Sequence, residues 1–207
     1  MDLKNIEKIQ NLLPVGYIFL VLFGIMKESI FYYQIGINII TYSSIMDILI
    51  SPIAVLTSHP IVFIAIVLLF ILFANMPSLL FKYEHTWWVQ KNFPIKNNTK
   101  EELSEEERKD YYTINTVKTC AFFLLSFFLG YGLGGGHFLS EKIKENKLEY
   151  DHVLTFSDQK SETVYIIGSN TAYYFYLSKG NQNVKITPVG SIKSIELIKN
   201  KMLTNTD

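Results

Sequence analysis

The sequence predicts a membrane α-helical region of three spans, with a fourth left open, followed by a small C-terminal all-β domain, either an SH3-like barrel or a curled antiparallel sheet. Residues 61–81 and 119–140 are long apolar stretches without Asp, Glu, Lys or Arg, as expected of helices that cross a bilayer. After residue 149 the pattern changes to short β-rich runs separated by turn residues. We therefore expect a transmembrane region at residues 1–140 and a β-domain at residues 141–207.

The predicted spans cover residues of about 12–33, 61–81 and 119–140. A helix rises about 1.5 Å per residue, so roughly 20 apolar residues cross a hydrocarbon core of about 30 Å. The second span ends at an aromatic belt beside Lys82, formed by Phe81, Tyr83, Trp87 and Trp88. The first span meets Lys27 and Glu28, which we expect to pair with each other or to extend toward the interface.

Four glycines near the end of the third span lie at helical spacing. Gly130 and Gly134 are four residues apart, as are Gly132 and Gly136. Small residues at this spacing let a second helix backbone approach closely. We expect these glycines to pack against a neighbouring span or a second copy of the chain, so a homo-oligomer is left open.

Residues 35–56 are too polar for a clear span and too apolar for a loop. Their periodicity favours an amphipathic helix with Ser44, Asp47 and Ser51 on its polar face. Such a helix could lie in the headgroup plane, re-enter the membrane or line a polar path. Asp47, with Asn38 and Ser44, is therefore a speculative polar membrane site, and the alternative is that Asp47 caps a helix.

The distribution of charge predicts the orientation of the spans. Residues 29–60 contain no Lys or Arg, whereas residues 82–118 contain seven, so the positive-inside rule makes only the second segment cytoplasmic. Three spans then place the C-terminal domain outside the cytoplasm, in a multi-pass protein of the cell (inner) membrane. A fourth span at residues 35–56 would move this domain to the cytoplasm, a side that Lys142, Lys144 and Lys147 favour.

The polar loop at residues 82–118 is expected to contain a solvated helix. Residues 99–102 (TKEE) form a capping-box pattern, which satisfies free amides at the start of a helix. The acidic run at residues 105–107 that follows is typical of a solvated helix face rather than of a cation site.

Five strands are predicted in the C-terminal domain, near residues 150–156, 163–168, 172–177, 183–187 and 192–198. So small a sheet has little core of its own. We expect the membrane surface, a partner or a second copy to shield one of its faces. One face carries Tyr173, Phe175 and Leu177, and the opposite face carries Tyr174 and Tyr176.

Composition and motifs exclude several functions. Lys+Arg and Asp+Glu balance at 19 each, so no basic surface for nucleic acid is expected. The single cysteine, Cys120, rules out disulfide frameworks and Cys-based zinc sites. The four histidines are far apart, and no nucleotide, hydrolase or metalloprotease motif is present. We expect no enzymatic activity, no metal and no cofactor.

Two runs carry a resemblance to a known group of proteins. Residues 16–56 (GYIFLVLFGIMKESIFYYQIGINIITYSSIMDILISPIAVL) and 164–197 (VYIIGSNTAYYFYLSKGNQNVKITPVGSIKSIEL) resemble a group of small bacterial integral membrane proteins with no known activity. The resemblance implies a bacterial, membrane-bound protein and brings no site residues.

These observations favour a non-enzymatic membrane anchor or sensor with a C-terminal β interaction domain. The lipid bilayer is the first partner expected, and an unknown protein or ligand at the β-domain is the second. The alternative is a subunit of an oligomeric ion channel or membrane pore. In that alternative the glycines serve assembly and the helix with Asp47 lines the pore.

Overall fold

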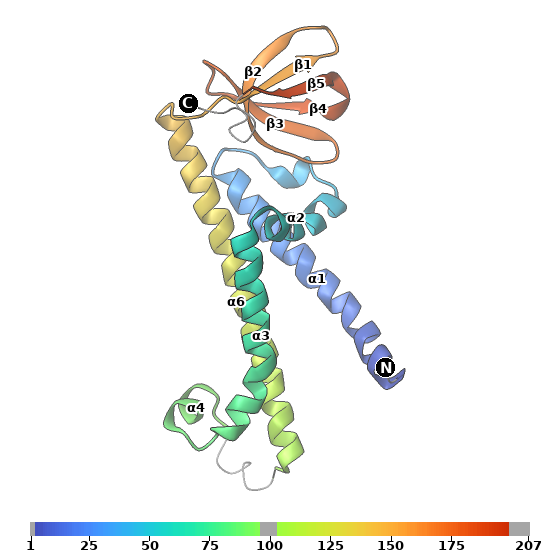
Figure 1. The fold of residues 1–207 in the computed structure, drawn as a ribbon, viewed down its shortest axis with the longest axis vertical. Helices are drawn as coiled ribbons and strands as arrows, with labels where there is room; N and C mark the ends of the chain where they lie inside the picture. Colours follow the sequence, from blue (N-terminus) through green and yellow to red (C-terminus); the bar gives the residue numbers. More distant parts are fainter. Residues whose placement is uncertain (1–2, 96–102, 199–207) are drawn as a thin grey trace, which may run out of the picture. The chain divides into compact units, whose positions relative to one another are not determined.

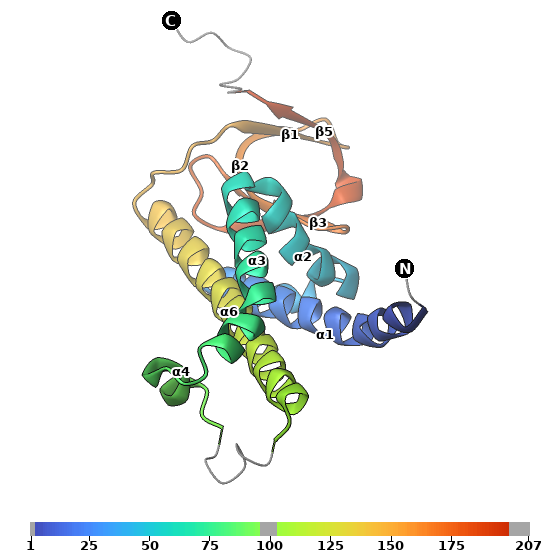
Figure 2. The same cartoon turned by 60° about the horizontal axis from the view of Figure 1, so that its bottom comes forward.

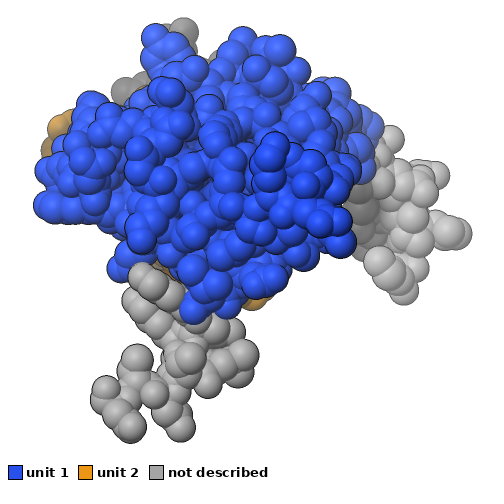
Figure 3. All heavy atoms as spheres, turned by 90° about the horizontal axis from the view of Figure 1, so that it is seen from above, with its two compact units in different colours: residues 1–52, 128–207 blue, residues 53–127 orange. Residues whose placement is uncertain are grey.

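The computed structural model describes residues 3–95 and 103–198, with side chains described from residue 14 onward. Helices precede a C-terminal sheet (Figure 1, and turned in Figure 2). The chain divides into two compact units, coloured in Figure 3. Unit 1 comprises residues 1–52 and 128–207, and unit 2 comprises residues 53–127.

Helix α1, Leu3–Tyr33, ends at a turn that depends on a glycine. Gly36 has a φ of 78°, which glycine adopts without steric cost. Its N–H donates to the Tyr33 carbonyl at 3.0 Å, and the Ile37 N–H donates to the Tyr32 carbonyl at 2.9 Å. This Schellman motif stops the helix. The chain then forms the 3-10 turn η1, Ile39–Thr41.

Helix α2, Ile45–Ser58, begins at a reciprocal cap. The Ser44 N–H donates to Asp47 Oδ2 at 2.8 Å, and the Asp47 N–H donates to Ser44 Oγ at 3.2 Å. The predicted helix at residues 35–56 is therefore wrong at its start, because the turn at Gly36 and this cap leave residues 35–44 without α-helix. The 14 residues of α2 extend about 21 Å, which is short of a bilayer core.

The described residues form three further α-helices: α3 (Pro60–Lys82), α4 (Trp87–Asn92) and α6 (Glu105–Lys144). Helix α6 begins at a cap in which the Ser104 N–H donates to Glu107 Oε2 at 2.8 Å and the Glu107 N–H donates to Ser104 Oγ at 3.3 Å. The capping pattern predicted at residues 99–102 lies outside the described residues. Within unit 2, Leu80, Val89 and Tyr112 form a buried core.

In the part of the chain that the structure describes, three helices are long and apolar enough to cross a membrane, which indicates a multi-pass membrane protein. They are Pro14–Tyr33 within α1, Pro60–Lys82, and the apolar part of Glu105–Lys144. The three predicted spans at about 12–33, 61–81 and 119–140 fall on these helices. Helix α2 is a shorter apolar helix.

The C-terminal residues form a five-stranded antiparallel sheet in the order β4-β3-β2-β1-β5. The strands are β1 (His152–Phe156), β2 (Ser161–Ser169), β3 (Tyr173–Ser178), β4 (Val184–Pro188) and β5 (Ile192–Leu197). All five predicted strands are confirmed, with ends that differ by one or two residues. Turn residues bound each strand because they satisfy backbone groups that the ladder leaves free.

The sheet is curled but not closed. Register shifts between Thr155 and Phe156 and between Ile166 and Gly168 increase its twist. The two edge strands β4 and β5 are joined only by the three-residue turn η2, Val189–Ser191. No pairing of β4 with β5 closes the sheet within the described residues, so the curled-sheet alternative is correct and the SH3-like barrel is not.

The two faces of the sheet have different neighbours. On the inner face Leu154, Val164 and Tyr176 form a buried core with other strand residues. On the outer face Phe175 is fully buried against Tyr32, Ile37 and Ile39. At β2, β3 and β4 the outer face is therefore covered by the chain's own residues 31–42, which run from the end of α1 into its connection to α2 (Figure 1). This occupant differs from the membrane surface, partner or second copy expected from the sequence.

Candidate functional site

Asp47 joins the start of α2 to the β-domain. Its Oδ2 accepts the Ser44 hydroxyl at 2.6 Å, and the same carboxylate accepts two hydrogen bonds from the β2–β3 turn. The Thr171 N–H donates to Oδ1 at 3.0 Å, and the Thr171 hydroxyl donates to Oδ2 at 3.1 Å. A carboxylate that serves both as a helix cap and as the acceptor of a distant turn fixes the two elements to each other.

Asn170 adds a second hydrogen bond between the same two segments. Its Oδ1 accepts the N–H groups of Ala172 and Tyr173, at 3.0 and 2.7 Å, and so shapes the β2–β3 turn. Its amide nitrogen donates to the Tyr42 carbonyl at 3.0 Å. The β2–β3 turn is thus hydrogen-bonded to Tyr42 and to Asp47, the two ends of the segment 42–47.

Ser51 lies one helical turn after Asp47 and contacts a charged pair on α1. Lys27 Nζ is 2.5 Å from Glu28 Oε1 and 3.1 Å from Ser51 Oγ, and the Ser51 hydroxyl donates to Glu28. The side chains of Lys27 and Glu28 are each 16 % exposed. The expected pairing of Lys27 with Glu28 is confirmed. Charges are costly within a span, so a third polar partner that helps to satisfy them matters for stability.

Residues 47 and 51 are four apart, so they lie on one face of α2. The N-terminal end of that face binds the β2–β3 turn, and the next turn of the same face binds the charged pair of α1. We name this set the polar linkage: Lys27, Glu28, Asp47, Ser51 and Thr171. It forms a continuous chain of hydrogen bonds and helix backbone from the β-domain to the first span, all within unit 1.

The four predicted glycines divide into two pairs. A Cβ on Gly132 would lie 2.6 Å from the Lys27 carbonyl oxygen, and a Cβ on Gly136 would lie 2.7 Å from that of Phe31. Among the described residues, nothing beyond the local backbone of α6 lies within 4 Å of such a Cβ on Gly130 or Gly134. Gly132 and Gly136 therefore allow α1 and α6 to pack backbone to backbone, and only Gly130 and Gly134 remain open to another partner.

The contacts between α1 and α6 also give the relative direction of the two helices. Gly132 faces Lys27, and Gly136 faces residues 31 and 34, so residue numbers rise together along both helices. The Gln34 amide nitrogen, near the end of α1, donates to the Leu133 carbonyl at 3.0 Å. The two helices are therefore parallel where they meet.

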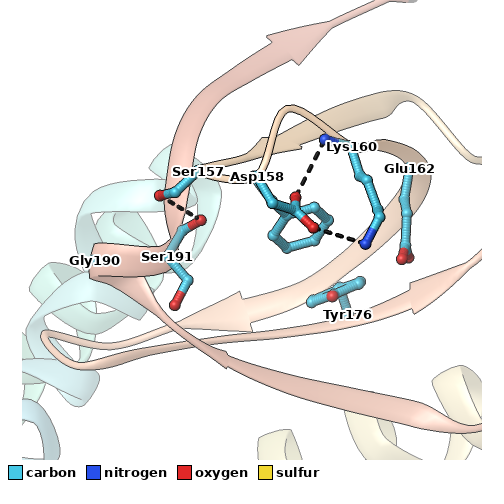
Figure 4. A pocket seen from close by; sticks show the side chains of 8 residues that line it. Ser157, Asp158, Lys160, Glu162, Tyr176, Gly190 and Ser191 are labelled. Atoms are coloured by element: carbon cyan, nitrogen blue, oxygen red, sulfur yellow. Dashed lines mark hydrogen bonds and ion pairs between the residues drawn. The ribbon is translucent and has the colours of Figure 1, made fainter.

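An open pocket of about 550 Å³ lies on the β-domain, between the β1–β2 turn and η2 (Figure 4). Figure 4 shows Tyr176 and Glu162 at the pocket, facing the Asp158–Lys160 pair of the β1–β2 turn. The pocket is lined by Phe156, Ser157, Asp158, Lys160, Glu162, Tyr176, Gly190 and Ser191. Its lining thus combines an aromatic floor with hydroxyl and paired charged groups.

Glu162 is the carboxylate of the pocket that is held most firmly. Lys185 Nζ donates to its two oxygens at 2.9 and 2.7 Å, and the Ser178 hydroxyl donates to it at 2.5 Å. The hydrogen bond from Lys185, with that from Ser178, lowers the pKa of Glu162 against the opposing effect of partial burial. At the rim, the hydrogen bond from Lys160 lowers the pKa of Asp158.

The structure brings together some of the predicted site residues and separates others. Ser44 and Asp47 are hydrogen-bonded, whereas Asn38 is exposed, and no side-chain cap bond holds η1 there. Sequence reasoning missed Thr171, and it treated Ser51 only as one residue of a polar arc. Thr171 follows a predicted turn, but no local pattern connects it with Asp47. Among the side chains that the structure describes, at residues 14–95 and 103–198, no group of three His, Cys, Asp or Glu could hold a metal ion.

No family model matches the chain, and no curated protein or solved structure is significantly similar to it. The class of protein therefore comes from the fold itself. The chain is a multi-pass membrane protein with three candidate spans and a C-terminal sheet domain.

Proposed function

We propose that the chain is a non-enzymatic membrane anchor and sensor whose β-domain binds a partner or ligand at the pocket. One observation carries this proposal: the outer face of the sheet is covered at β3 by residues 31–42, while the pocket on the β-domain stays open. A β-domain that served only to anchor the chain would need only its outer face, which packs against residues 31–42. The open pocket, with its aromatic floor and polar rim, has the character of a small ligand or peptide site.

The polar linkage supports the sensor part of the proposal. A change in the conformation of the β2–β3 turn alters its hydrogen bonds to Asp47. The first turns of α2 transmit this change to Ser51 and to the charged pair of α1. Thr171 and Lys27 lie on elements far apart in sequence, yet one helical turn of α2 separates their contacts. Binding at the β-domain would then alter the environment of Lys27 and Glu28 in the first span.

The parallel packing of α1 and α6 supports an extracytoplasmic β-domain. Two spans that cross in the same direction need an odd number of crossings between them, and α3 alone supplies one. A further crossing by α2 would make α1 and α6 antiparallel. With segment 82–118, which contains six Lys and one Arg, inside, the end of α6 and the β-domain after it lie outside.

Site-specific photocrosslinking in living cells tests the binding surface. A photoreactive residue replaces Lys160, whose side chain is 81 % exposed at the pocket rim. Lys179, exposed on the β3–β4 turn and absent from the pocket lining, is the matched control. A discrete adduct at position 160 that is missing at 179 supports the proposal. No adduct at 160, or the same adducts at both positions, counts against it.

Hydrogen exchange of the purified protein tests the linkage. Asp47→Ala removes both the helix cap and the acceptor for Thr171, whereas Ser44→Ala removes cap interactions and leaves that acceptor. Losing one hydrogen bond of about 1 kcal/mol speeds exchange roughly fivefold. We expect faster exchange at residues 169–173 in the Asp47 variant and not in the Ser44 variant. Equal exchange there in both variants would show that the turn does not depend on Asp47.

A further inference from the structure

We propose that the outward face of α2, formed by Ile45, Met46 and Ile50, is inserted into the bilayer interface. We name these three residues the α2 apolar face. This inference goes beyond the proposed binding at the pocket, because it assigns a different surface and a different partner, the acyl chains at the membrane boundary.

Helix α2 exposes apolar side chains, whereas a helix on a water-soluble protein exposes polar ones. Ile45, Met46 and Ile50 are 58, 53 and 48 % exposed. The inward side of the same turns holds Ile48, which is 5 % exposed, and Ser51, which is 7 % exposed and bonded to Glu28. The half-buried Asp47 is bonded to Ser44 and Thr171. An apolar exterior with polar groups satisfied inside the protein is what a lipid environment requires.

The depth of α2 relative to the first span also indicates acyl chains as the partner. Ser51 contacts Lys27 and Glu28, which precede the end of α1 at Tyr33 by five or six residues. At about 1.5 Å per residue, this contact lies about 8 Å inside the end of the first candidate span. The first turns of α2 therefore lie at the depth where interfacial helices bury their apolar side chains, roughly 5–10 Å into the boundary.

The charge of the segment also fits lipid better than water or a polar partner. Residues 45–58 contain one charged side chain, Asp47, and it is turned away from the α2 apolar face toward the β-domain. The outward face thus presents no group that would have to be desolvated on insertion. A second copy of the chain on this face would have to displace lipid that is already as apolar as the side chains.

The insertion has a consequence for the polar linkage. Asp47 and Ser51 lie on the same two turns as the α2 apolar face, so movement of α2 in the bilayer is transmitted to Thr171 and to the charged pair of α1. The bilayer thereby becomes a partner that acts on the same elements as the β-domain.

Fluorescence quenching in phospholipid vesicles tests the insertion. Single cysteines at Met46 and at Ile50, in a Cys120→Ala background of the full chain, are labelled with an environment-sensitive dye. Ile18, 58 % exposed on the first span, gives the lipid reference, and Lys179 on the β3–β4 turn gives the water reference. The probes of the surroundings are phospholipids brominated along the acyl chain and, separately, iodide in the buffer.

We expect blue-shifted emission at positions 46 and 50, quenching by brominated lipid as at position 18, and no quenching by iodide. Quenching by iodide as at position 179 would overturn the proposal, because the face would be in water. Protection from both quenchers would overturn it too, because a protein surface would then cover the face. Using two positions guards against a single substitution that disturbs the fold.

Discussion

Single side chains decide how closely the β-domain approaches the first span. Tyr32, Ile37 and Phe175 are all buried in one cluster that joins α1, the turn after it and β3. Tyr32 and Phe175 place their ring centres 5.1 Å apart. The sheet comes so close that a Cβ on Gly168 would lie 2.5 Å from the Tyr32 hydroxyl. The glycine at 168 leaves room for this hydroxyl, and the position has no unusual backbone angle.

Gly168→Ala is therefore expected to destabilise the docking of the β-domain, typically by about 1–3 kcal/mol as for other overpacked sites. Adding Tyr32→Phe should restore most of the loss, because the next nearest atom, the Tyr32 ring carbon Cζ, lies at 3.8 Å. Thermal unfolding of the detergent-solubilised chain measures both variants. Tyr32→Phe alone is the control, and a double variant no more stable than Gly168→Ala would contradict the geometry.

Glu162 makes the stability of the β-domain depend on pH. Because its pKa is lowered in the folded protein, its contribution is fully present above the unfolded pKa of about 4.3 and is lost as pH falls through the folded value. Wild type should exceed Glu162→Gln in stability at pH 7, and the gap should narrow below about pH 4. Unfolding followed from pH 7 to pH 3 measures this. Glu196→Gln, exposed on β5, should keep the wild-type profile.

At the scale of elements, the packing of the helices depends on which face each helix presents to its neighbour. Helix α6 presents Gly132 and Gly136 to α1, and α1 presents the backbone of Lys27 and Phe31. Helix α2 turns Ser51 inward and Ile50 outward. Contact between helices in a membrane relies on close backbone approach, since apolar burial gains little where lipid is the alternative. Small residues at the contact thus matter more than large apolar ones.

Gly132→Ala or Gly136→Ala should separate α1 from α6, because each added methyl group would meet a backbone oxygen. Gly130→Ala and Gly134→Ala, with nothing near the added methyl, should leave the contact intact and serve as matched controls. Thermal unfolding of the detergent-solubilised chain reports the loss of the contact. Equal stability of all four variants would exclude close packing at Gly132 and Gly136.

At the scale of the whole molecule, the direction of the spans bears on the side of the membrane on which we propose the β-domain to lie. Helix α6 runs unbroken over 40 residues, which is about 60 Å, so it extends beyond a hydrocarbon core of about 30 Å. Its ends must lie in different aqueous compartments if its apolar part crosses. The sheet follows one end, and the loop with α4 precedes the other.

Cysteines at Lys179 in the β3–β4 turn and at Lys91 in α4, each in a Cys120→Ala background, should therefore label on opposite sides of the membrane. We expect an impermeant maleimide to label position 179 in intact cells and position 91 only after lysis. The reverse pattern would invert the orientation and put the β-domain in the cytoplasm. Labelling of both positions from the same side would contradict a crossing by α6.

Much of the fold was predictable because it depends on local pattern. The three spans are defined by runs of apolar residues long enough for a bilayer, and the strands by alternation between turns such as residues 168–170. These signals reflect the solvent around each segment. The cap formed by Ser44 and Asp47 was also predictable as an alternative, since its partners are three residues apart.

The tertiary structure alone decided which of these residues meet. Asp47 binds Thr171 across 124 positions of sequence, and Ser51 binds Glu28. Of two glycine pairs with identical spacing, only Gly132 and Gly136 face α1. Spacing along one helix defines a face but not its neighbour, because the neighbour is selected by the packing of distant segments. The sequence by itself therefore determined the spans and strands, and tertiary packing determined how the β-domain is joined to the membrane region.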